Sequence, residues 1–139
     1  MNRVEELRRV HAEIERLKDE AQRLSVPIAM NMGMIYNLYD VFVMSLKRLE
    51  PEASPKETNS RKKFLYAILY IFSPATLVGE VMRHRMRERI SDILDCTPTG
   101  VSRDYKIALF FYATYKEFRD EVDEIIKDML NILGKDENL

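Results

Sequence analysis

Cysteine, histidine, glycine and proline are scarce in this chain of 139 residues, and each scarcity excludes a class of protein. The single cysteine, Cys96, excludes an internal disulfide and fits a reducing compartment. The two histidines, His11 and His84, lack metal-ligand spacing with each other or with Cys96. Four glycines and five prolines form no low-complexity segment and no phosphate-binding glycine loop. We therefore expect no metal and no cofactor.

Long apolar runs and catalytic constellations are also missing. No run of eighteen apolar residues occurs, so the sequence predicts no membrane span. The start, MNRVEELRRV, is highly charged and lacks the apolar stretch of a signal peptide. The acidic residues between positions 120 and 128 are typical of a solvated helix face rather than of paired catalytic carboxylates. These absences predict a protein that is not an enzyme and has no small-molecule substrate.

The net charge of −1 hides an uneven distribution along the chain. Residues 1–54 carry 8 basic and 9 acidic side chains, residues 55–103 carry 9 and 5, and residues 104–139 carry 5 and 9. The middle segment, at +4, is the only candidate for a nucleic-acid footprint, because such a footprint is a local basic face.

The first thirty residues predict an amphipathic helix with a heptad seam. Apolar residues separated alternately by three and four positions form it: Leu7, Val10, Ile14, Leu17, Ala21, Leu24 and Ile28. Such a seam fits either a partner helix or packing on the chain's own domain.

Proline placement suggests the next boundaries. Pro27 predicts the start of a second, largely buried helix that ends before Pro51, although a kinked continuation of the first helix is an alternative. Residues 50–60 contain two prolines and no large apolar residue, which predicts a linker. The chain thus divides into a helical arm (1–49), a linker (50–60), a core (61–133) and a tail (134–139).

Within the core, the pattern predicts further helices and no strand. Ser60 is a candidate cap for a helix through residue 72, followed by a short helix or turn from Ser73 and a helix to residue 94. From Thr97 one long helix is expected to reach about Leu133, with Gly134 as its C-terminal cap. A second heptad seam supports this length: Phe111, Tyr115, Phe118, Val122, Ile125, Met129 and Ile132. The predicted fold class is all-α.

The stretch ISDILDCTPTGVSRDY, residues 90–105, meets the requirements of a helix-turn-helix. Its first helix ends in apolar residues, and Asp95 stands in the turn, where a left-handed backbone is tolerated. Thr97 can cap the second helix, and Val101 is its expected buried residue.

The segment LDCTPTGVSRDY resembles the LG-V-S-x-S-T-V-S-R pattern of tri-helical helix-turn-helix domains in bacterial and phage regulators. SPATLVGEVM and KIALFFYATYKEF are similar to small helix-turn-helix proteins of phages and mobile elements. The resemblance implies sequence-directed binding of double-stranded DNA, by a regulator or by a packaging or replication accessory, in the host cytoplasm or a virion. Asp95 in place of the usual turn glycine, and Gly100 within the second helix, depart from the pattern.

Side chains on and around this motif are the expected DNA contacts. Arg and Lys neutralise phosphates, and Arg commonly pairs with guanine in the major groove. The candidates for phosphate contact are Lys62, Lys63, Arg83, Arg85 and Arg87. The candidates on the second helix are Thr97, Thr99, Ser102, Arg103 and Lys106.

A different class of function, an oligomerising structural or scaffold protein, fits the two heptad seams and the acidic C-terminal third. In that interpretation the helix-turn-helix is only a packing motif. Both interpretations predict a homo-oligomer, with the N-terminal seam at Leu7, Val10, Ile14, Leu17 and Leu24 in the interface. The aromatic C-terminal seam is expected to pack into the domain core instead.

Overall fold

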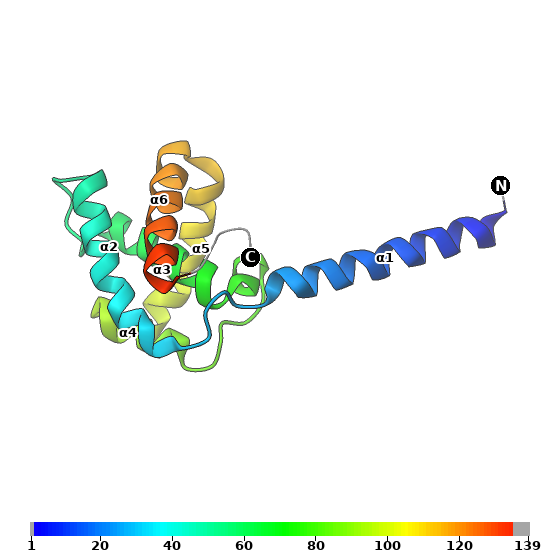
Figure 1. Ribbon diagram of the computed structural model, residues 1–139, viewed down its shortest axis with the longest axis horizontal. Helices are drawn as coiled ribbons and strands as arrows, with labels where there is room; N and C mark the ends of the chain where they lie inside the picture. The colour runs from blue at the N-terminus through cyan, green and yellow to red at the C-terminus, as the bar shows by residue number, and fades with distance from the viewer. Residues whose placement is uncertain (1, 135–139) are drawn as a thin grey trace.

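The computed structural model describes residues 2–134, which form six α-helices, two 3-10 segments and no strand (Figure 1). The all-α class predicted from the sequence is confirmed. Within these residues, no helix has the length and apolar character that a bilayer crossing requires. Residues 135–139 of the predicted tail lie outside the described part of the chain.

Helix α1 (Arg3–Ser25) projects away from a body formed by the other helices (Figure 1). The side chain of Asn2 caps it by accepting a hydrogen bond from the Val4 amide at 2.7 Å. None of its residues is buried, so nothing in the chain's own core covers its apolar seam.

The helix predicted to start at Pro27 starts instead at Ile35. The amides of Ile28 and Ala29 both donate to the Ile71 carbonyl, at 2.8 and 3.2 Å. That carbonyl lies in the last turn of a helix, where it has no partner within the helix, so an extended segment satisfies it better than a helical one. Ile28 therefore packs on the core and does not extend the seam of α1. A 3-10 segment, η1 (Met32–Met34), then leads into α2.

Helix α2 (Ile35–Leu49) belongs to the core and not to the predicted arm. Its buried face consists of Ile35, Leu38, Phe42 and Leu46, and it packs on α3 and α6. The predicted linker is therefore a loop between two core helices. It is also shorter than predicted, because α3 (Thr58–Phe72) begins before Ser60, which is a buried helical residue and not the cap.

Helix α3 lies at the centre of the body, with buried side chains on all its faces. Every residue from Lys62 to Leu69 is buried, and α2, α5, α6 and the 3-10 segment η2 (Pro74–Val78) pack around it. A helix buried on all sides needs a partner for each polar group that it carries inward.

Of the two buried lysines of α3, Lys62 and Lys63, Lys63 forms ion pairs inside the body. Its side chain is 2% exposed, and its Nζ pairs with Glu121 of α6 and, at 3.2 Å, with Glu50 at the end of α2. Burial raises the pKa of the Glu121 carboxyl, while hydrogen bonding to Glu121 and Lys63 lowers the pKa of Glu50. This cluster links three helices through one cation.

The predicted long C-terminal helix is two helices, α5 (Pro98–Thr114) and α6 (Lys116–Leu133). Tyr115 between them has an extended backbone, with φ −108° and ψ 112°. The second heptad seam is therefore wrong as a continuous stripe, and its members Tyr115 and Ile132 are 51% and 61% exposed. The aromatic ring of Phe111 contacts those of Tyr115 and Phe118 edge-on, at 5.4 and 5.6 Å between centroids.

The break allows α6 to fold back and bury its apolar face on α2 and α3. The hydroxyl of Tyr112 on α5 donates to Asp123 of α6 at 2.6 Å and ties the hairpin together. Gly134 ends α6 with a left-handed backbone, φ 69°, which confirms the predicted cap.

Replacing Lys63 with methionine should lower the free energy of unfolding by about 3 kcal/mol at neutral pH, because Glu50 and Glu121 lose their buried counter-charge. Lys47→Met, at an exposed position on α2, should stay within about 0.5 kcal/mol of the parent protein. Urea unfolding followed by circular dichroism measures both. Equal effects of the two substitutions would contradict the structural role of the cluster.

Candidate nucleic-acid interface

Helices α4 (Met86–Leu94) and α5 pack against each other and are joined by residues 95–97. Asp95 has a left-handed backbone, φ 53° and ψ 51°, as the sequence predicted for this turn position. The Cys96 amide donates to the Ser91 carbonyl at 3.0 Å, which satisfies an end group of α4. The turn thus closes with aspartate in place of glycine.

Thr97 caps α5 as predicted. Its Oγ1 accepts a hydrogen bond from the Gly100 amide at 3.0 Å, and Pro98 occupies the first helical position. A Cβ on Gly100 would lie 3.2 Å from this same Oγ1. The glycine that departs from the helix-turn-helix pattern therefore leaves room for the cap.

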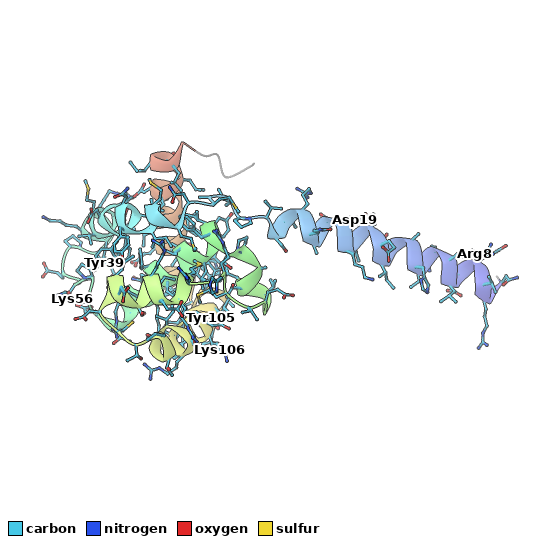
Figure 2. The ribbon with its side chains drawn as sticks, turned by 90° about the horizontal axis from the view of Figure 1, so that it is seen from below. Arg8, Asp19, Tyr39, Lys56, Tyr105 and Lys106 are labelled. Carbon is cyan, nitrogen blue, oxygen red and sulfur yellow. The ribbon has the colours of Figure 1, made fainter. Side chains whose placement is uncertain are left out.

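Helix α5 carries polar and basic side chains on one outward stripe. Thr99, Ser102, Arg103 and Lys106 are spaced by three or four residues, or are adjacent, so they share a face of the helix. Thr99, Arg103 and Lys106 are exposed, and Ser102 is half-buried. Figure 2 labels Lys106 beside Tyr105 on this helix.

A hollow of about 450 Å³ lies between α5 and the segment that leads into α4. We call it the basic cleft, and its charged and polar lining residues are Arg83, His84, Arg85, Arg87, Glu88, Ser102, Tyr105 and Lys106. Arg87 Nη1 donates to Ser102 Oγ at 3.1 Å and connects the two helices across it. The cleft therefore gathers cations from two elements onto one surface.

Arg85 has a left-handed backbone, φ 65°, at the position that precedes α4. Left-handed residues other than glycine are uncommon, and they cluster at functional sites, where the surrounding structure holds them. The side chain of Arg85 is exposed at the rim of the basic cleft.

Three of the predicted phosphate contacts are buried or already bonded within the protein. Lys62 and Lys63 are 5% and 1% exposed, so neither reaches a phosphate, and the prediction for both is wrong. Arg83 lines the basic cleft, but its guanidinium donates to backbone carbonyls of Met30, Phe72 and Ala29, at 2.9, 3.2 and 3.5 Å. Arg83 therefore holds the end of α3, the segment after α1 and the segment before α4 together.

The other predicted side chains fall into two groups. Arg85, Arg87, Ser102 and Lys106 meet at the basic cleft. Thr97, Thr99 and Arg103 lie toward the start of α5 and do not line it; Thr97 is occupied as the cap.

The acidic side chains near the helix-turn-helix motif differ in their exposure and in their distance from the basic cleft. Asp104 is 9% exposed and lies 3.5 Å from the Arg103 Nε, so its charge points inward and is paired. Asp92 and Asp95 are exposed near the turn, and Glu88 lines the basic cleft beside Arg87. The cleft remains a predominantly cationic surface.

Five lining residues were not among the predicted contacts, and two of them, His84 and Tyr105, carry side chains that can hydrogen-bond to phosphate. His84 stands between Arg83 and Arg85 in the sequence, and Tyr105 directly precedes Lys106. In the sequence, their only indication of a role is that each stands next to a predicted contact. The fold shows that both line the same hollow.

The cysteine thiol and one cluster of carboxylates are the other side chains that could act as a nucleophile or as metal ligands. Burial raises the pKa of the Cys96 thiol, which disfavours the thiolate that a nucleophile requires. Among residues 2–134, the carboxylates of Glu50, Glu117 and Glu121 lie within 4.8 Å of one another, as metal ligands would. The ammonium of Lys63 pairs with two of them and supplies the positive charge there.

Thr97→Ala should lower the free energy of unfolding by about 1 kcal/mol, because the first turn of α5 loses its side-chain acceptor. Thr97→Ser keeps the hydroxyl and should stay close to the parent protein. Urea unfolding compares the two substitutions. An alanine variant as stable as the serine variant would show that the cap does not position α5.

No protein-family model, curated protein or solved structure among those compared with this chain matches it. The comparisons therefore add no relative from which a role could be carried over.

Proposed function

We propose that the protein binds double-stranded DNA through the basic cleft and the adjoining stripe of α5. The observation that carries the proposal is the convergence of three exposed cations on one hollow: Arg85 just before α4, Arg87 in α4, and Lys106 in α5, which a three-residue turn joins to α4. A helix, a tight turn and a second helix with polar residues on its outer face follow one another in the same order as in helix-turn-helix proteins, whose second helix enters the major groove.

The chemistry of the cleft suits phosphate. Arg85, Arg87 and Lys106 are basic side chains, and cations that neutralise phosphates release condensed counterions from DNA. Ser102 adds a hydroxyl between them, already oriented by Arg87. These contacts fix the position of the protein on the duplex and carry no sequence information themselves.

Discrimination between DNA sequences depends on side chains at the exposed start of α5. Arg103 has 71% of its side chain exposed, and Thr99 lies one helical turn before it. A guanidinium can donate two parallel hydrogen bonds to guanine, and a threonine methyl can contact thymine. With the phosphates held in the basic cleft, α5 presents both side chains along one stripe.

Neutralising the cleft should abolish most of the affinity for any duplex. For the triple variant Arg85→Gln, Arg87→Gln, Lys106→Gln, we expect the slope of log K against log salt to fall by about 2.7, the loss of three phosphate contacts. Fluorescence anisotropy of a labelled duplex at several salt concentrations measures this slope.

A matched control separates the cleft from the overall charge. The triple variant Lys47→Gln, Lys56→Gln, Lys127→Gln removes the same charge from exposed positions that do not line the cleft. Figure 2 shows Lys56 apart from Lys106. Equal slopes for the two triple variants, or no binding by the parent protein at low salt, would overturn the proposal.

Arg103→Ala should weaken binding to a duplex selected from a random pool by about 1–3 kcal/mol, because one base-edge contact is lost. Binding to unselected duplexes should change little. Lys106→Ala is the comparison, since loss of a phosphate contact weakens all duplexes alike. Competition titrations give both ratios, and an Arg103 variant with unchanged preference would remove this residue from base recognition.

An oligomerising structural protein is the second candidate function, and the exposed seam of α1 favours it. In this alternative the α4–α5 pair only packs within the body. The absence of any duplex binding by the parent protein at low salt, together with stable oligomers, would select it.

A further inference from the structure

The described residues leave one apolar stripe of α1 exposed, although η2 contacts the helix: Leu7, Val10, Ile14, Leu17, Ala21 and Leu24. Its large apolar side chains are 41–62% exposed, on a helix of 23 residues with none buried. Helical stability in water comes mostly from packing an amphipathic face, and an isolated apolar stripe of this kind marks an interaction site. Arg8 and Asp19, on other faces of α1, extend into open space (Figure 2).

The spacing assigns each residue of the stripe a heptad position. Leu7, Ile14 and Ala21 occupy a positions, while Val10, Leu17 and Leu24 occupy d positions. The central heptad, with Ile14 at a and Leu17 at d, has the combination that favours two parallel strands. The partner that fits this stripe is another helix with the same repeat.

The charges beside the stripe differ between its two edges. All three g positions hold glutamate, namely Glu6, Glu13 and Glu20. None of the four e positions inside the helix is acidic: they hold Val4, His11, Lys18 and Ser25, of which Lys18 is the basic one. Because e and g residues meet across a coiled-coil interface, this asymmetry decides both the partner and its direction.

In a parallel pair, each g residue faces the e residue of the following heptad on the other helix. Glu13 then faces Lys18 of the second copy, and Glu6 faces its His11, twice in each dimer. In an antiparallel pair, g faces g and e faces e, so glutamates oppose one another and Lys18 opposes His11. The charge pattern is complementary to itself only in the parallel arrangement.

Pairs within α1 do not compete strongly with these contacts. Glu6, Glu13 and Glu20 each lie near an arginine three residues further on, at positions 9, 16 and 23. All of these side chains are about half exposed or more. Exposed pairs contribute little unless they are bidentate, as Arg16 and Glu13 are. A carboxylate accepts more than two hydrogen bonds, so each glutamate can still meet a donor across an interface.

We propose that α1 docks on α1 of a second copy as a parallel, in-register, two-stranded coiled coil. Both bodies then lie at the same end of the coil, where each chain leaves α1 at Val26. An antiparallel pair would separate them by about 35 Å, the length of the helix. The inference rests on α1 alone and is independent of DNA binding.

Sedimentation equilibrium of the full chain tests the docking surface. The parent protein should be a dimer at tens of micromolar, and Ile14→Glu should be a monomer with an unchanged urea unfolding transition of the body. Ala12→Glu introduces the same charge at an f position and should remain a dimer. A monomeric parent protein, or a dimeric Ile14→Glu variant, would overturn the proposal.

Charge reversal tests the direction. Lys18→Glu places two glutamates opposite each other at both Glu13 contacts of a parallel dimer, so the dissociation constant should rise about fivefold. The added change Glu13→Lys should restore the parent value. In an antiparallel dimer the new glutamate would face His11 and no other carboxylate, so a dissociation constant that does not rise would overturn the parallel arrangement.

Discussion

The burial of α3 on every face is the constraint on which the rest of the structure depends. A single helix with no solvent face requires neighbours all around it, and α2, α5, α6 and η2 provide them. It also requires that the two lysines of its first turns be accommodated inside the body. Lys63 meets this requirement by pairing with Glu50 and Glu121, and so the end of α2 and the middle of α6 are tied to the same point.

The candidate interface lies on surfaces of α4 and α5 that α3 does not cover. Helix α4 packs on α5 and α2 and is not among the main contacts of α3, so its outer side and the adjacent stripe of α5 stay on the surface. Arg83 then links this surface to α1, because its guanidinium bonds the carbonyls of Met30 and Phe72. One side chain thereby fixes how the basic cleft sits relative to the segment that leads out of α1.

Local signals were enough to predict some elements from the sequence. The heptad spacing predicted α1, and Asp95 and Thr97 predicted the turn and the cap, because these features involve residues only a few positions apart. The stripe of α5 and the cations before α4 were predicted for the same reason.

Long-range contacts account for what could not be predicted. Lys63 looks like a surface cation beside Arg61 and Lys62, and its partner Glu121 lies 58 residues further on. Likewise, the sequence around α2 predicts part of an arm. In the structure α2 belongs to the core, and its Ser45 donates a hydrogen bond to Asp128, 83 residues away, at 2.6 Å. Tyr115 interrupts a regular heptad pattern without proline or glycine, and only the return of α6 onto α2 and α3 explains the break.

The central claim is that DNA is held at the basic cleft and the adjoining stripe of α5. Lysine acylation of the parent protein, read by mass spectrometry with and without a duplex, tests it most directly. The account predicts that Lys106 loses reactivity on adding DNA, that exposed Lys47, Lys56 and Lys127 keep theirs, and that buried Lys62 and Lys63 react in neither state. Protection of Lys47 or Lys127 while Lys106 stays reactive would contradict it.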